Sequence, residues 1–154
     1  MSVYLLALAI GVFTGMRTMG APTAVSVAAR MGWLDVSGTW LAFLGYAFTP
    51  WVLALCAIGE LVVDQLPSTP SRTVPMQFSA RVLAGMLSGA AIGAAHGSML
   101  FGLAAGAIGA VIGTLGGYAL RMRLAKAFGH DRPAAFIEDA VAYLGVALVV
   151  SALP

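Results

Sequence analysis

Apolar residues form long blocks along this chain, and short polar stretches separate them. In the second half, the apolar blocks cover residues 78–96, 98–120 and 134–152. A helix that crosses a bilayer needs roughly 17–25 apolar residues, so each block is long enough for one span. Residues 96–98 predict a tight turn and residues 127–133 predict a loop.

The first half is less regular. Its opening apolar stretch is too long for one span. It is interrupted at residues 15–22, which contain two glycines and one proline, residue types that break helices. Two interpretations follow. Either one broken helix crosses once, or two short helices, 3–16 and 22–34, form a hairpin. Residues 38–66 are expected to form one long segment with a kink near Pro50.

The positions of the basic residues favour the hairpin and six segments. That layout brings to one side the following residues: Arg17, Arg72, Arg81, Arg121, Arg123, Lys126 and Arg132. Only Arg30 is left on the other side. Since cytoplasmic loops carry an excess of Lys and Arg, the cluster is expected in the cytoplasm and both termini outside.

We therefore expect an all-α integral membrane protein, a compact helical bundle of five to six transmembrane segments. It forms one transmembrane domain over residues 1–154. Three segments lie in residues 1–66, a cytoplasmic loop in 67–77, and three segments in 78–154. Because each half has an odd number of segments, this layout is compatible with an inverted 3+3 arrangement.

Composition supports a membrane setting and excludes several classes of function. Hydrophobic residues make up 60% of the chain and charged residues 9%, against roughly 25% charged residues in soluble domains. The net charge is +2, and no basic run alternates with aromatic residues, so no nucleic-acid partner is expected. Cys56 is the only cysteine, so neither an intrachain disulfide nor a cysteine metal cluster is expected.

Glycines recur every four residues in two sets in the second half. The first set is Gly85, Gly89, Gly93 and Gly97. The second is Gly102, Gly106, Gly109, Gly113 and Gly117, with one three-residue step between Gly106 and Gly109. Small residues at this spacing let helix backbones approach closely in lipid. We expect a tightly packed helix hairpin or packing between subunits of a homo-oligomer; a glycine-lined conduit is the alternative.

Two carboxylates lie where charge is costly. Glu60 and Asp64 are four residues apart at the end of an apolar segment, so they share one helix face. A charge at bilayer depth costs at least ~2.5–3.5 kcal/mol, which makes such an acid a candidate functional residue. The six-segment layout gathers the following candidates for binding an ion or substrate: Glu60, Asp64, Arg17, Arg72, Arg81, Glu138, Asp139 and Arg121.

Four interpretations of this gathering stay open. The charges could form a structural network, with Arg17–Glu60 and Arg81–Glu138 as ion pairs. Glu60 could bind and release a proton or cation in a transporter or channel-like protein, which is the leading hypothesis.

The other two concern lipid headgroups. Arg72, Arg81 and Arg121 could bind an anion or headgroup. Alternatively, Glu60, Asp64 and Glu138 could hold a divalent metal in an enzyme that acts on headgroups.

Catalytic signatures are missing from the chain. It contains no Ser-His-Asp spacing, no phosphate-cradling Gly-Lys loop and no HExxH motif. His96 and His130 are expected in loops on opposite sides of the membrane, too far apart to share a metal. We assign no catalytic residue, cofactor or metal. The expected partners are membrane lipids, other copies of the chain, and a small ion or molecule of unknown identity.

Several of these residues also carry a family resemblance that covers nearly the whole chain. The motifs are Gly15-Met16-Arg17-Thr18 with Ala21-Pro22, Gly59-Glu60…Asp64-Gln65-Leu66-Pro67, Thr69-Pro70-Ser71-Arg72-Thr73, Arg81, Gly85, Gly117-Tyr118, Arg121 and Ile137-Glu138-Asp139-Ala140. They resemble the motifs of a family of small bacterial inner-membrane proteins known as a domain of unknown function. Related sequences often have Lys where this chain has Gln65. The resemblance implies a multi-spanning membrane protein but no activity, substrate or catalytic residue.

Overall fold

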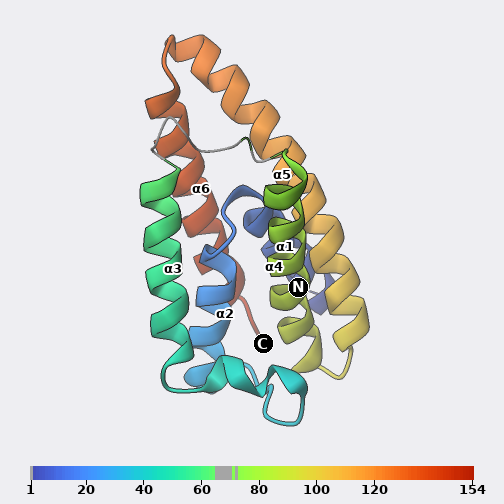
Figure 1. Cartoon of the computed structure of the whole chain (residues 1–154). Coiled ribbons are helices and arrows are strands. Elements are labelled where there is room, and N and C mark those ends of the chain that lie inside the picture. Colours follow the sequence, from blue (N-terminus) through green and yellow to red (C-terminus); the bar gives the residue numbers. More distant parts are fainter. Residues whose placement is uncertain (1, 65–70, 72) are drawn as a thin grey trace.

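The computed structural model describes residues 2–64, 71 and 73–154 of the chain, and in this part helices are joined by turns and loops, without strands (Figure 1). The helices are α1 (Val3–Met16), α2 (Gly20–Arg30), the 3-10 helix η1 (Trp40–Gly45), α3 (Thr49–Val63), α4 (Pro75–Ala94), α5 (Met99–Phe128) and α6 (Asp131–Ser151). The expected all-α class is thereby confirmed.

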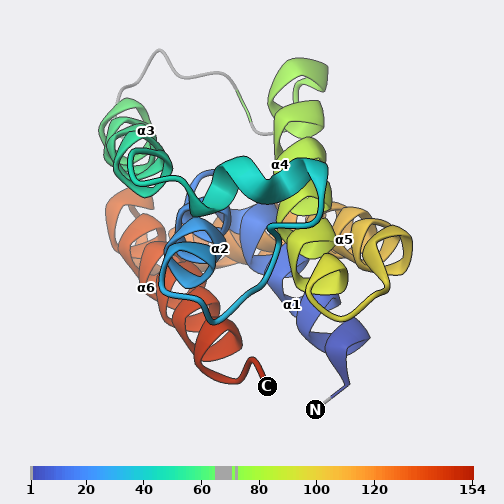
Figure 2. The same cartoon turned by 90° about the horizontal axis from the view of Figure 1, so that it is seen from below.

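Successive α-helices alternate in direction, and both termini lie toward the same end of the bundle (Figure 1). Helix α1 packs against α4, α5 and α6 and forms the centre of the bundle. Helix α3 stands at the edge, where it packs mainly against α2 and η1 (Figure 2). The first interruption of the chain is therefore a hairpin turn between α1 and α2, one of the two alternatives that the sequence left open.

Apolar and polar residues separate along the bundle axis. The buried apolar core includes Leu6 and Ile10 of α1, Val25 of α2, Leu41 of η1 and Ile92 of α4. These residues lie toward the end that carries the termini. Buried charged side chains belong to the opposite parts of the same bundle: the end of α1 and the first halves of α4 and α6. The partly buried Glu60 and Asp64 lie at the end of α3.

The expected single kinked segment over residues 38–66 is wrong. The chain forms η1, turns, and then begins α3 at Thr49, with Pro50 in the first turn. Proline lacks a backbone N–H and disfavours helix in the residue before it, so it starts a new helix here rather than bending an old one. In η1, the Thr39 hydroxyl accepts a hydrogen bond from the Leu41 N–H and caps the helix start.

Helix α5 is longer than expected, because it continues past residue 120 to Phe128. The added turns consist largely of Leu, Met, Arg, Lys and Ala, which are good helix formers. Gly129 then ends the helix with a φ of 74°, the left-handed conformation that glycine adopts most easily. The expected loop over residues 127–133 therefore shrinks to a short turn before α6.

Two of the described helices, α5 and α6, are long and apolar enough to cross a membrane. Helices α1 and α3 are apolar but have only 14 and 15 residues, below the usual spanning length. The structure thus supports two spans by length and composition. It does not support the expected five to six spans or the inverted 3+3 arrangement.

Glycines let α5 touch two helices without side chains between them. A Cβ added at Gly102 or Gly106 would collide with the backbone of α4 at Gly89 or Gly85. A Cβ at Gly109 or Gly113 would instead collide with the carbonyl of Leu8 or Val12 on α1. The three-residue step in the glycine spacing therefore marks a change of partner from α4 to α1.

The remaining glycines of this series have different roles. Gly85, Gly89 and Gly93 of α4 all approach α5 closely, and Gly117 is buried within α5. Gly97, in contrast, has no neighbour within 4 Å of an added Cβ, and its φ is 71°. Its role is to make the turn between α4 and α5 rather than to pack helices, which corrects its place in the expected series.

A methyl group at Gly106, where α5 lies against the backbones of α4 and α1, should weaken the bundle. We expect Gly106→Ala to lower the free energy of unfolding by about 1–3 kcal/mol, because two backbones must move apart. Gly116→Ala is the matched control on the same helix. Nothing lies within 4 Å of its added Cβ, and helix propensity should raise stability by up to about 1 kcal/mol. Equal unfolding free energies of the two variants in detergent would contradict this packing.

Candidate functional site

A break in the helical backbone lies at the centre of the polar end. Helix α1 ends at Met16, and Arg17 takes an extended conformation with φ −136° and ψ 118°. After two more residues, α2 begins at Gly20. A helix end leaves carbonyl groups without partners, and a helix start leaves N–H groups without partners. The break thus brings carbonyl groups from the end of α1 and N–H groups from the start of α2 close together, both without helical partners.

The carboxylate of Glu60 satisfies the N–H groups at the start of α2. Its two oxygens accept hydrogen bonds from the backbone N–H of Thr18, at 2.7 Å, and of Met19, at 2.9 Å. A negative charge at this position also interacts favourably with the positive end of the helix dipole. Glu60 comes from α3, so this cap joins α3 to the α1–α2 turn.

The guanidinium of Arg81 performs the opposite role at the end of α1. Its Nη1 donates to the carbonyl oxygens of Gly15, at 3.1 Å, and Met16, at 2.8 Å. The Thr114 hydroxyl also donates to the Gly15 carbonyl, at 3.2 Å. Arg81 is buried, and its Nη2 lies 3.9 Å from Glu60 Oε1. Opposite charges therefore cap the two sides of the break and also attract one another.

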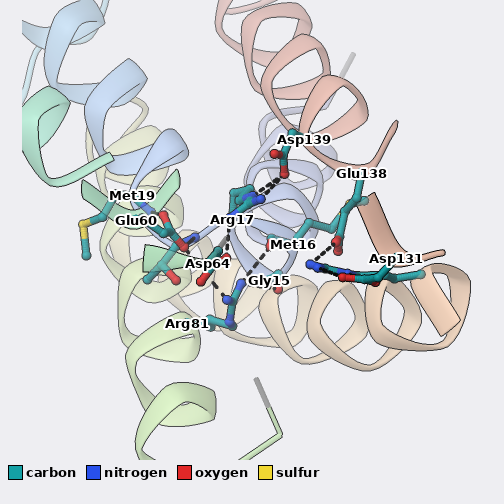
Figure 3. A network of polar contacts seen from close by, with 12 residues as sticks. Gly15, Met16, Arg17, Met19, Glu60, Asp64, Arg81, Asp131, Glu138 and Asp139 are labelled. Atoms are coloured by element: carbon teal, nitrogen blue, oxygen red, sulfur yellow. Dashed lines mark hydrogen bonds and ion pairs between the residues drawn. The ribbon is translucent and has the colours of Figure 1, made fainter. Parts of the chain in front are cut away.

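Arg17, which lies in the break, bridges two further helices (Figure 3). Its guanidinium forms ion pairs with Asp64 at the end of α3 and with Asp139 in α6. The Arg17 side chain is only 1% exposed, whereas Asp64 and Asp139 are 15% and 14% exposed. Because Arg17 is buried, it needs at least one of these two partners, since an unpaired buried charge is strongly destabilising.

A second set of charges lies apart from the break. Arg121 of α5 binds Asp131 with two hydrogen bonds, at 2.9 and 2.5 Å, and lies 3.5 Å from Glu138. Glu138 is buried, with 2% of its side chain exposed. These contacts tie the end of α5 to the beginning of α6.

The expected ion pairs are therefore rearranged. Arg17 binds Asp64 and Asp139, where Glu60 was expected, and Glu138 lies by Arg121, where Arg81 was expected. Glu138 follows Asp139 directly on α6, and adjacent helix positions point about 100° apart, so the two acids serve different partners. Each acid lies at the expected end of the bundle, but the direction in which its side chain points decides its partner.

A cavity reaches the Arg17 bridge from the side. It has a volume of about 770 Å³ and lies between α3 and α6. Most of its lining is apolar, from residues such as Ile58, Val62, Phe136 and Leu144, and it includes Asp139, Tyr143 and Arg132. A second cavity of about 350 Å³ shares Ile58, Leu61 and Tyr143 with it and extends toward α2. Among the charged residues of the break, Asp139 is the one that lines the larger cavity.

Sequence reasoning missed three residues of this region. Tyr143 lines both cavities, and its buried hydroxyl has no hydrogen-bond partner within the described chain. Asp131 binds Arg121, and Arg132 lines the larger cavity. All three lie on α6 near Glu138 and Asp139. Tyr143 follows Asp139 by four residues, a spacing that could have indicated a shared face.

Two further expectations concern the cytoplasmic loop with Arg72 and a metal site formed by three acids. Arg72 and residues 67–70 of the loop expected at 67–77 lie outside the described residues, and residues 75–77 already belong to α4. Within the described part, no group of three His, Cys, Asp or Glu side chains is placed to hold a metal ion. The metal set expected from Glu60, Asp64 and Glu138 is not assembled, because Glu138 lies with Arg121 instead.

Comparison with known proteins gives no match: no family model, curated protein or solved structure is similar to this chain. The family resemblance of the sequence motifs therefore stays a prediction. The site must be interpreted from its own chemistry.

Replacing Glu60 should test its capping role. In Glu60→Gln, one acceptor oxygen remains and the amide NH₂ faces a backbone N–H, so we expect a loss of about 1–3 kcal/mol in unfolding free energy. Asp35→Asn, in the exposed loop before η1, is the control and should change stability by less than about 0.5 kcal/mol. Equal stability of both variants would show that Glu60 does not cap α2.

Proposed function

We propose that this chain is a multi-pass membrane protein that transports or conducts a proton or small cation, with the Arg17–Asp64–Asp139 bridge as its switchable site. One observation carries the proposal: the cavity between α3 and α6 reaches Asp139, a carboxylate of a buried ion-pair bridge. Ionisable residues that face a cavity within membrane segments typically belong to ion or proton pathways.

The charges of the bridge suggest which acid exchanges the ion. Around the break, three carboxylates (Glu60, Asp64 and Asp139) contact two guanidinium groups (Arg17 and Arg81). Glu60 is held by two backbone N–H groups, whereas Asp139 lines the cavity. A proton or cation on Asp139 would leave Arg17 paired with Asp64 alone. The proposed exchange site therefore moves from Glu60 to Asp139.

A movement of α3 would link this exchange to transport. Helix α3 packs mainly on α2 and η1, and few of its side chains are buried. Its last turns make polar contacts with the bundle, among them Asp64 with Arg17 and Glu60 with both the start of α2 and Arg81. Since a proton or cation bound to Asp139 competes with Arg17 for that carboxylate, its binding would change how firmly Arg17 and Asp64 attach α3 to the bundle. Discontinuous helices at a polar site are common in transporters.

The proposal includes the membrane arrangement. We place α5 and α6 as full spans and the shorter α1–α4 as further segments of a multi-pass protein in the bacterial inner membrane. The polar end, with Arg121, Arg123 and Lys126, would face the cytoplasm. Exposed apolar side chains such as Leu83, Phe101 and Ile112 would face lipid or a second copy of the chain.

Proteoliposomes that contain dyes for pH, Na⁺ and K⁺ would test the proposal. An imposed membrane potential should drive proton, Na⁺ or K⁺ flux through the wild-type chain. Asp139→Asn should fold, because Arg17 keeps Asp64, and should lower the flux at least about tenfold, as expected when a relay group is lost. Asp35→Asn should transport normally.

Either of two results would overturn the proposal. One is that the wild-type chain gives no flux of any of the three ions above that of empty liposomes. The other is that Asp139→Asn gives wild-type flux. If Glu60→Gln lost flux without losing stability, Glu60 rather than Asp139 would be the exchange site.

A structural or accessory membrane protein is the second candidate. The observation that favours it is the complete capping of the helix break by Glu60 and Arg81. In that case the charges only hold helices together. Substitutions at Asp64 or Asp139 would then change stability or assembly, while no ion flux would be measured for the wild-type chain.

A further inference from the structure

The two cavities form one long apolar groove along the side of the molecule. Six α6 residues line the larger cavity over positions that span Arg132 to Leu144, a length of about 18 Å along the helix. The smaller cavity continues from Tyr143 to Val146 and Ala147. The opposite wall is α3, through residues such as Ile58 and Leu61. The groove therefore has the elongated apolar shape that suits a hydrocarbon chain.

Positive charge gathers at one end of this groove. Arg132 lines it there, in the first turn of α6, and its guanidinium makes no hydrogen bond or ion pair with another residue that the structure describes. Lys126 and Arg123 are exposed in the last turns of α5, which meet the start of α6 (Figure 1). The nearby Asp131 is held by Arg121, so it does not neutralise this end.

The carboxylate in the groove does not reverse this polarity. Asp139 lies about two turns from Arg132 and is ion-paired with Arg17, which it shares with Asp64. Beyond Asp139, the polar atom in the lining is the Tyr143 hydroxyl, among apolar side chains such as Phe136 and Leu144. The groove thus has a cationic mouth and an apolar body.

From this pattern we infer that the α3–α6 groove binds one anionic phospholipid of the surrounding bilayer. The phosphate lies at Arg132, near Lys126, and one acyl chain lies along α6 toward Ala147. Surface basic residues attract anionic lipids by about 1 kcal/mol each. The inference rests on the proposed membrane location but not on ion transport. The bound lipid would also fill the space between α3 and the bundle.

Native mass spectrometry of the whole chain tests this directly. The protein is held in a neutral detergent that contains equal amounts of phosphatidylglycerol and phosphatidylcholine. We expect one retained phosphatidylglycerol per chain in preference to phosphatidylcholine. Arg132→Gln should reduce that retention about fivefold, which corresponds to the loss of about 1 kcal/mol. Arg30→Gln, an exposed arginine on α2, is the matched control and should retain lipid normally.

A second pair of variants tests the apolar body of the groove. Ala140→Trp fills the groove and should displace both lipids, whereas Ala104→Trp, exposed on α5, should not. Equal retention of the two lipids, normal retention by Arg132→Gln or Ala140→Trp, or equal losses in the controls would overturn the inference. The wild-type chain separates the inference from the proposed function. Absent ion flux would overturn only the proposed function, whereas equal retention of the two lipids would overturn only this inference.

Discussion

The ion-pair bridge of Arg17 connects α3 and α6, two helices that otherwise make few contacts with each other. Arg17 lies between α1 and α2, Asp64 ends α3, and Asp139 belongs to α6. Removing one member of a buried ion pair typically costs about 3–5 kcal/mol, since the remaining charge loses its partner. Because α3 packs mainly on α2 and η1, this bridge is its principal connection to α6. The width of the groove between the two helices depends on it.

The bridge can exist because the backbone is interrupted there. A continuous helix would satisfy its own N–H and carbonyl groups, but the turn at Arg17 leaves some of each without helical partners. Glu60 accepts from the N–H groups, and Arg81 donates to the carbonyl groups. The charges that would be costly in an apolar bundle therefore stabilise a turn that the bundle could not otherwise bury. At the other end, the apolar core needs no such groups.

The sequence predicted the helical class, the α1–α2 hairpin as one alternative, and, apart from Arg72, which lies outside the described residues, the residues that gather at the polar end. These depend on composition, on glycine and proline positions, and on helix periodicity, all of which are local. The ion pairs were assigned wrongly, because pairing depends on helix rotation and side-chain direction, which one sequence does not reveal. The contact of Gly109 and Gly113 with α1 was also missed, although the step after Gly106 marked a change of face.

The claim that Arg17 holds α3 against the bundle can be tested by a distance measurement across the groove. Spin labels are placed at Val62→Cys and Phe136→Cys, both exposed, in a Cys56→Ala background. Pulsed electron paramagnetic resonance then gives the distance distribution between α3 and α6. Adding Arg17→Gln should broaden that distribution and shift it to longer distances, while Arg30→Gln should leave it unchanged. An identical distribution with and without Arg17 would contradict the claim.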